Sequence, residues 1–81
     1  MDLFNYRDGQ LFCEDVNLDD LAQRHGTPLY VYSRKTFEHH FDTLRNAFAA
    51  LNPTICYSIK SCGNLHIVKL LVDRGAGMDV V

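Results

Sequence analysis

The chain has 81 residues, of which 47% are hydrophobic, and its ten acidic and eight basic side chains leave a formal net charge of −2. This length allows one small domain at most, and the apolar share is that of a globular protein rather than a disordered one. Acidic and basic residues are interspersed, so nothing indicates a nucleic-acid-binding surface or a basic membrane patch. No apolar run approaches the length of about 18 residues that a membrane span needs, and the first residues do not resemble a signal peptide. The three cysteines are an odd count without a CxxC pair, which favours a reduced, cytoplasmic setting.

Residues 1–33 are predicted to form a short hairpin, a helix and a strand. Asp8 and Gly9 supply a turn between two short apolar runs. Asn17 can cap a helix that Gly26 would end. The buried face of this helix would consist of Leu18, Leu21 and Ala22. The β-branched and aromatic run at residues 28–32 predicts a strand.

A long amphipathic helix is predicted next, because apolar side chains recur at alternating steps of four and three. These side chains are Phe37, Phe41, Leu44, Phe48 and Leu51. Ser33 is a natural N-cap for this helix, which we expect to end near Asn52.

The remaining residues predict a strand, a helix and a second strand. The strand covers residues 54–60, Asn64 can cap the helix, Gly75 can end it, and the second strand begins at residue 77. The apolar face of the helix would consist of Leu65, Val68, Leu71 and Val72. Two strands joined by one helical crossover require a parallel sheet, so the expected fold class is α/β. Because the sequence stops inside a parallel strand, we expect it to be the N-terminal piece of a longer α/β protein.

Lys60 lies at the end of the first of these strands. If side chains alternate along it, one face carries Thr54, Cys56, Ser58 and Lys60, and the other carries Ile55, Tyr57 and Ile59. Small residues below the carboxyl end of a parallel strand leave room for a ligand, and ligands in α/β folds bind at that end. A partly desolvated lysine amine can form a Schiff base with an aldehyde. The alternative is that Lys60 leaves the sheet and extends into water.

Asp79 is an acid inside an otherwise apolar strand, which is unfavourable unless the acid is paired. Alternation puts Gly77, Asp79 and Val81 on one face. If this strand neighbours residues 54–60, Asp79 could face the same interior as Lys60. The alternative is an outward-facing or edge-facing aspartate.

Two other features of the sequence are weaker candidates for a functional site. His39 and His40 are adjacent, so they lack the spacing of three or four that a helical metal-ligand pair needs, and no metal site is predicted. Cys62 is either a reactive thiol at the rim of a pocket or a small packing residue.

The segments TPLYVYS, YSIKSCGNLHIVKLL and GAGMDVV resemble the opening of the diaminopimelate decarboxylases. Members of this family are pyridoxal-phosphate enzymes of the alanine racemase-like fold, a (β/α)8 barrel with an added β domain. Their usual strand motif, Tyr-Ala-x-Lys-Ala-Asn, is matched by Tyr57, Ser58, Ile59 and Lys60, with serine in place of alanine. Order and spacing agree over nearly the whole chain.

The resemblance implies that the chain starts a parallel (β/α)8 TIM-type barrel. Residues 1–33 would join the β domain, and residues 34–81 would supply the first helix, strand 1, a helix and the start of strand 2. Lys60 would be the catalytic residue and would hold pyridoxal 5'-phosphate covalently. Asp79 would line the cofactor pocket near that lysine, and Ser58 would be a small residue on the pocket floor. The full-length protein would act on a small amino acid and form a homodimer.

The implied reaction is decarboxylation of meso-diaminopimelate to L-lysine, a step of lysine biosynthesis. In such a reaction the substrate amine would displace Lys60 from the cofactor, the cofactor would serve as an electron sink when CO2 leaves, and Lys60 would return when the product is released. The family commonly has Ala-Asn-Ser-Asn after the lysine, whereas this chain has Ser61, Cys62, Gly63 and Asn64. The alternatives are therefore a decarboxylase for ornithine, arginine or carboxynorspermidine, or a non-catalytic pyridoxal-phosphate-binding or structural fragment. The phosphate- and substrate-binding residues lie downstream in the family, so the 81 residues alone are expected to be inactive.

Overall fold

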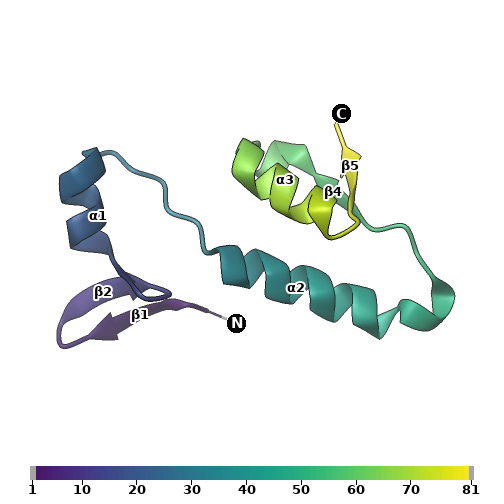
Figure 1. Ribbon diagram of the computed structural model, residues 1–81, viewed down its shortest axis with the longest axis horizontal. Helices are drawn as coiled ribbons and strands as arrows, with labels where there is room; N and C mark the ends of the chain where they lie inside the picture. Colours follow the sequence, from purple (N-terminus) through teal and green to yellow (C-terminus); the bar gives the residue numbers. More distant parts are fainter. Residues whose placement is uncertain (1, 81) are drawn as a thin grey trace. The chain divides into compact units, whose positions relative to one another are not determined.

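The computed structural model describes residues 2–80, which fall into two compact units, Met1–Thr36 and Phe37–Val81 (Figure 1). No helix within residues 2–80 is long and apolar enough to cross a membrane. Val81, which the sequence places on one face with Asp79, lies outside the described residues.

The first unit contains a three-stranded antiparallel sheet. Its strands are β1 (Phe4–Arg7), β2 (Gln10–Cys13) and β3 (Val16–Asn17), in the order β1-β2-β3. Asp8 and Gly9 join the first two strands with positive φ angles of 52° and 78°. Positive φ at both central residues is the geometry of a two-residue turn that matches the twist of a hairpin. The predicted hairpin is therefore confirmed.

Helix α1 (Leu18–His25) follows the sheet directly. The Oδ1 atom of Asn17 accepts a hydrogen bond from the Asp20 N–H at 3.2 Å, which confirms the predicted N-cap. Gly26 ends the helix with a φ of 80°, and its N–H donates to the Ala22 carbonyl at 2.7 Å. The apolar face expected for this helix is only half-buried, at Leu18, Leu21 and Ala22. The prediction of a buried face was too strong, because α1 packs against a sheet of only three short strands.

The strand predicted at residues 28–32 is wrong. The segment is not a strand, and the peptide bond between Thr27 and Pro28 is cis. A strand needs a partner for its backbone groups, and within residues 2–80 no strand pairs with this segment. Its β-branched and aromatic side chains favour a pleated surface, but propensity alone does not create a ladder.

Helix α2 (Arg34–Ala47) begins where it was predicted. The Ser33 Oγ accepts a hydrogen bond from the Thr36 N–H at 3.2 Å, so the predicted cap is confirmed. A short 3-10 turn, η1 (Ala49–Leu51), follows the helix and ends at Asn52, whose φ is 47°. The predicted end near Asn52 is correct, although the last turn is not α-helical.

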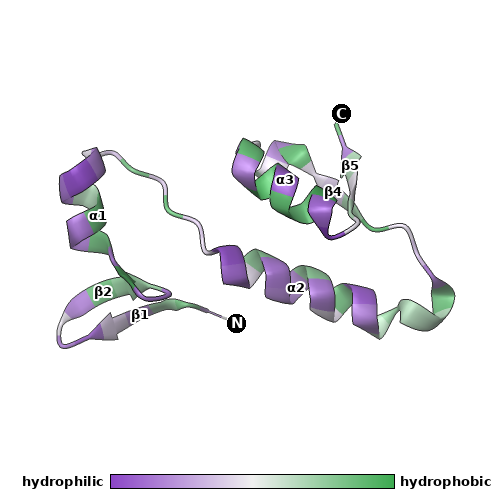
Figure 2. Ribbon diagram, viewed as in Figure 1, coloured by the Kyte–Doolittle hydropathy of each residue, from purple (hydrophilic) through white to green (hydrophobic). Residues whose placement is uncertain are grey.

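The apolar stripe of α2 is visible as green bands that alternate with purple ones along the helix (Figure 2). Phe41 is buried and Phe37 is half-buried. The rest of the predicted stripe is exposed within the described residues, at Leu44, Phe48 and Leu51. The stripe is therefore continuous in the sequence, but the second unit of the chain covers only the first part of the stripe.

The second unit contains a parallel βαβ arrangement, as predicted. Strand β4 (Cys56–Ser58) pairs in parallel with β5 (Gly77–Asp79), and helix α3 (Leu65–Asp73) connects them. The Oδ1 of Asn64 accepts from the first free N–H groups of α3, including that of His66 at 2.9 Å. The predicted cap and the predicted crossover are both confirmed.

Strand β4 is shorter than the predicted strand at residues 54–60. After Ser58 the chain enters a 3-10 turn, η2 (Ile59–Ser61), in which the Ser61 Oγ donates to the Ser58 carbonyl at 2.7 Å. Only Cys56–Ser58 has a strand to pair with, so the alternation of side chains stops there. The placement of Ile59 and Lys60 on opposite faces of a strand is therefore corrected: both lie in a turn.

The apolar core of the second unit consists of four buried residues with five partly buried ones around them. The buried residues are Phe41, Ile67, Leu71 and Ala76, and the others are Phe37, Ile55, Tyr57, Cys62 and Met78. The predicted face of α3 was right for Leu71 but wrong for Leu65 and Val72, which are exposed. Ile67 and Leu71 are four residues apart and share a face, whereas Leu65 lies on the opposite side of the helix.

An ion-pair network also joins α2 to the end of α3. The Arg74 guanidinium donates to both Asp42 carboxylate oxygens, at 3.0 Å and 2.9 Å, and to the Glu38 carboxylate. The Arg45 guanidinium donates to the Arg74 carbonyl at 2.8 Å. The two terminal nitrogens of one guanidinium thus bind two different carboxylates of α2, and these charge-assisted hydrogen bonds orient the end of α3 relative to α2.

Candidate functional site

The register of the β4–β5 ladder decides which predicted site residues meet. Ser58 pairs with Asp79, and Tyr57 pairs with Met78. Side chains of paired residues in neighbouring strands lie on the same face of the sheet. Tyr57 and Met78 pack against the apolar core, so Ser58 and Asp79 lie on the opposite face, at the carboxyl ends of their strands. The structure thus brings together two of the three residues that the sequence singled out.

The next pair of residues along this face leaves little space between its side chains. Cys56 pairs with Gly77, and a Cβ atom on Gly77 would lie 3.0 Å from the Cys56 Sγ. This contact shows that paired residues of the two strands share this face. The face therefore carries small side chains beneath the ends of the strands, which is the arrangement the sequence predicted for β4.

Ser58 has an unusual environment. Its Oγ is buried and makes no hydrogen bond within residues 2–80, although the side chain as a whole is only half-buried. Its backbone carbonyl is already used by the Ser61 hydroxyl. A buried hydroxyl without a partner is unfavourable by about 1–3 kcal/mol, so this atom is a candidate for a further interaction.

Lys60 lies two residues after Ser58, in the turn η2, and is exposed. Within residues 2–80 its amine makes no hydrogen bond or ion pair. Because the residue is in a turn, strand alternation does not place its side chain relative to Ser58 and Asp79. An exposed amine at the carboxyl end of a parallel strand suits both a covalent ligand attachment and an extension into water.

The loop after Lys60 is fixed by a contact that the sequence did not reveal. The Tyr57 hydroxyl donates to the Cys62 carbonyl at 2.8 Å, and the Tyr57 ring meets Phe37 edge-on with ring centres 6.5 Å apart. Cys62 itself is half-buried against the apolar core. Of the two interpretations of Cys62, this position favours the packing residue over the reactive thiol.

The histidine pair shows no metal-binding arrangement. The His39 and His40 rings lie edge to face with centres 5.6 Å apart. No group of three histidine, cysteine, aspartate or glutamate residues within residues 2–80 is arranged to hold a metal ion.

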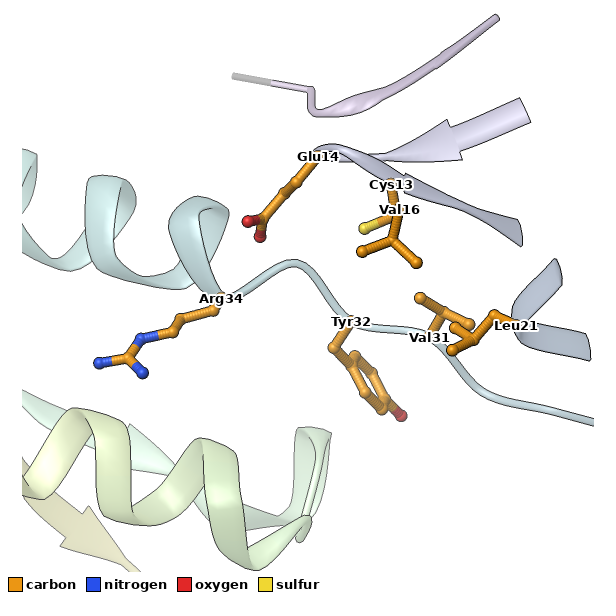
Figure 3. A pocket seen from close by; sticks show the side chains of 7 residues that line it. All are labelled: Cys13, Glu14, Val16, Leu21, Val31, Tyr32 and Arg34. Carbon is orange, nitrogen blue, oxygen red and sulfur yellow. The ribbon is translucent and has the colours of Figure 1, made fainter. Parts of the chain in front are cut away.

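A pocket of about 230 Å3 lies in the first unit (Figure 3). It is lined by Cys13, Glu14, Val16, Leu21, Val31, Tyr32 and Arg34. Figure 3 shows the Glu14 carboxylate turned toward the start of α2. None of the residues predicted to hold a cofactor lines this pocket, and its walls are mainly apolar, so its chemistry differs from that of the β4–β5 face.

Glu14 links the turn after β2 to the first turn of α2. Its Oε2 accepts hydrogen bonds from the Ser33 hydroxyl at 2.8 Å and from the Lys35 N–H at 3.1 Å. The hydrogen bond from the Lys35 N–H, followed by that from Ser33, lowers the pKa of the Glu14 carboxyl below its usual value of 4.5. Sequence reasoning missed this cap, because the carboxylate and the helix start are far apart in the chain and no local motif joins them.

Replacing Glu14 with glutamine is expected to destabilise the protein near neutral pH by about 1 kcal/mol, because neutral hydrogen bonds replace charge-assisted ones. A folded-state pKa below the unfolded one gives stability that is complete above about pH 4.5 and is lost as the pH falls through the lowered pKa. The Glu14→Gln protein should therefore lose less stability than wild type in acid. Urea unfolding at several pH values, with hydrogen exchange of the Lys35 amide, measures both effects.

The matched control is Asp15→Asn. Asp15 is exposed and pairs with Arg7 at 3.1 Å, an interaction worth about 0–1 kcal/mol at a surface. If Asp15→Asn and Glu14→Gln had the same effect on acid stability, the account of Glu14 as a helix cap would be wrong.

Comparison with known proteins places this geometry in context. No family model matches the chain. Curated diaminopimelate decarboxylases do match it: that of Aquifex aeolicus is 51% identical over 76 residues, which are 94% of this chain and 18% of the relative. That of Vibrio cholerae is 46% identical over 82 residues, which cover this chain fully and 20% of the relative. The chain thus spans about a fifth of the length of the curated relatives it matches.

Solved structures agree with the sequence matches. The crystal structure of AQ1208 from Aquifex aeolicus has a TM-score of 0.91 and 49% identity, and the match covers 98% of this chain and 19% of that one. The diaminopimelate decarboxylase from M. jannaschi has a TM-score of 0.88 and 32% identity, with coverage of 98% and 20%. These findings confirm the resemblance predicted from the sequence: over its whole length the chain is similar to one segment of diaminopimelate decarboxylases.

Proposed function

We propose that the full-length protein containing this chain decarboxylates meso-diaminopimelate to L-lysine with the help of pyridoxal 5'-phosphate. The observation that carries the proposal is the 51% identity, over 94% of the chain, to a protein named as a diaminopimelate decarboxylase. The activity is a proposal because the chain spans about a fifth of such relatives.

The residues of the β4–β5 face suit this cofactor. Lys60 offers an exposed amine without a partner within residues 2–80, directly after the carboxyl end of a parallel strand. Gly77 and Ser58 are small residues, so they leave room for a ligand on the neighbouring face of the sheet. The buried Ser58 hydroxyl also has unused hydrogen-bonding capacity. When bound, pyridoxal phosphate supplies an electron sink for the charge that remains when CO2 leaves.

In this proposal, three residues of the chain have distinct tasks. Lys60 would bind the cofactor covalently through Nζ, which is the nucleophile of the chain in this proposal. Asp79 lines the pocket and provides a negative charge at the end of β5. Ser58 forms part of the pocket floor. The groups that hold the phosphate and the substrate would come from residues outside this chain.

We also infer the setting of this site in the full-length protein. The parallel β4–β5 pair with its α3 crossover is the repeating unit of a (β/α)8 barrel, which supports residues 34–81 as the start of such a barrel. Residues 1–33 would join a β domain. The odd cysteine count supports a cytoplasmic enzyme, and the family resemblance supports a homodimer.

The experiment compares CO2 release from meso-diaminopimelate, ornithine, arginine and carboxynorspermidine by the full-length protein with added pyridoxal phosphate. The proposal expects kcat/KM for diaminopimelate to exceed the others by at least about 100-fold, because a site built to pair a polar group discriminates strongly against substrates that lack it. Faster release from ornithine or arginine would overturn the substrate assignment. Release from none of the four would favour a non-catalytic protein.

A further inference from the structure

The Ser58 hydroxyl is the one buried side-chain polar atom within residues 2–80 that has no hydrogen-bond partner. Native proteins rarely leave such a group unpaired, because its desolvation is not compensated. Two neighbouring hydroxyl groups are already used: the Ser61 hydroxyl donates to the Ser58 carbonyl, and the Tyr57 hydroxyl donates to the Cys62 carbonyl. Neither of these hydroxyls pairs with the Ser58 hydroxyl, so the next candidate partner lies on the same face of the sheet.

The side chain across the ladder from Ser58 is Asp79. Neighbouring strands lie about 4.8 Å apart, so side chains of paired residues on one face come within hydrogen-bonding reach through a change of rotamer. A carboxylate has two oxygens with about four acceptor positions, so Asp79 can accept this bond in addition to its other interactions. On the opposite face of the ladder, Tyr57 and Met78 contact the apolar core.

We propose that Ser58 is a positioning residue: its hydroxyl donates a hydrogen bond to the Asp79 carboxylate across the β4–β5 ladder and so holds that carboxylate beside the Lys60 turn. The role in positioning rests on the proposed function, in which Lys60 carries the cofactor. A carboxylate with a fixed orientation stabilises a positive charge on the Lys60 nitrogen more than a mobile one does. Ser58 thereby acts on Lys60 through Asp79 rather than by direct contact.

The first part of the test is a double-mutant cycle in the full-length protein without added cofactor, using Ser58→Ala, Asp79→Ala and the double variant. The proposal expects Ser58→Ala to lower the Tm by about 2–4 °C in the wild-type background and to have no effect in the Asp79→Ala background. Cys56→Ala is the matched control, since it removes a side chain one pair earlier on the same face and should lower the Tm equally in both backgrounds.

If the Ser58 hydroxyl has no partner, Ser58→Ala is expected to raise the Tm instead of lowering it. If Ser58→Ala raised the Tm, or lowered it equally with and without Asp79, the hydrogen bond would be excluded. These results do not depend on the cofactor, so they decide the bond even if the proposed function fails.

The second part tests positioning with a readout that a purely structural role would not move. The absorbance of the protein loaded with pyridoxal phosphate is followed against pH. The midpoint of the change reports the protonation of the Lys60 nitrogen that is bonded to the cofactor. The proposal expects Ser58→Ala to move the midpoint to lower pH by about half a unit, and Cys56→Ala to leave it in place. An unchanged midpoint in Ser58→Ala would overturn the positioning role, whereas the absence of any cofactor absorbance in the wild type would overturn the proposed function itself.

Discussion

Replacing Lys60 with alanine is expected to remove the absorbance of cofactor bound to the full-length protein and to lower kcat by at least about 100-fold. The reason is that Lys60 is the proposed covalent attachment point and stands at the carboxyl end of a parallel strand, where ligands bind in α/β folds. Absorbance spectra after addition of pyridoxal phosphate and initial rates of CO2 release measure the two effects.

Lys69→Ala is the matched control for this experiment. Lys69 is also an exposed lysine of the second unit, but its amine is held by Asp73 at 2.7 Å, one turn away on α3. This variant should keep the cofactor absorbance and nearly all of the activity, because an exposed helical ion pair is worth only about 0.3–0.5 kcal/mol. An unchanged spectrum in Lys60→Ala, or an equal loss in Lys69→Ala, would contradict the assignment of Lys60.

Replacing Leu71 with alanine is expected to destabilise the second unit by about 2–5 kcal/mol, through lost apolar burial and the cavity left behind. Leu71 is the most buried of the core side chains, with 3% of its surface exposed, and it belongs to the cluster that holds α3 against the rest of the unit. Urea unfolding of the protein, followed by circular dichroism, gives the change in the free energy of unfolding.

Leu65→Ala provides the comparison on the same helix with the same change of side chain. Leu65 is 80% exposed, so its replacement should change the free energy of unfolding by no more than about 0.5 kcal/mol. If the two variants unfolded at the same urea concentration, α3 would present a different face to the core than the structure shows.

The features that could be predicted from the sequence are those with local causes. Asn17, Ser33 and Asn64 each cap a helix through a backbone N–H two or three residues away, so their roles follow from nearby residues alone. The turn at Asp8 and Gly9 is likewise decided by which residues tolerate positive φ. The parallel crossover followed from the order of the elements, since a helix between two adjacent strands leaves no short antiparallel connection.

The features that the sequence did not reveal depend on partners far along the chain. The segment at residues 28–32 has the composition of a strand, but it lacks a strand to pair with in the described residues. Glu14 caps α2 from about twenty residues away. On α3, Leu65 and Leu71 are the same residue type, and only the packing of the unit decides that Leu71 is buried.

The candidate site shows both kinds of feature. Alternation and the family resemblance predicted small side chains on one face of β4 and a ligand-binding role for Lys60. The register of the ladder then placed Ser58 opposite Asp79. Alternation failed at Lys60 itself, because β4 ends at Ser58 and a 3-10 turn begins. The unpaired Ser58 hydroxyl could not be predicted, since burial of a single atom depends on the three-dimensional arrangement.

The role of Lys60 is tested most directly by locating the bound cofactor on the chain. The full-length protein loaded with pyridoxal phosphate is reduced with borohydride, which makes the bond between a lysine and the cofactor permanent, and its peptides are then weighed by mass spectrometry. We expect the added mass on the peptide that contains Lys60 and on no other lysine. A stable addition at a different lysine, or none at Lys60, would show that Lys60 does not hold the cofactor.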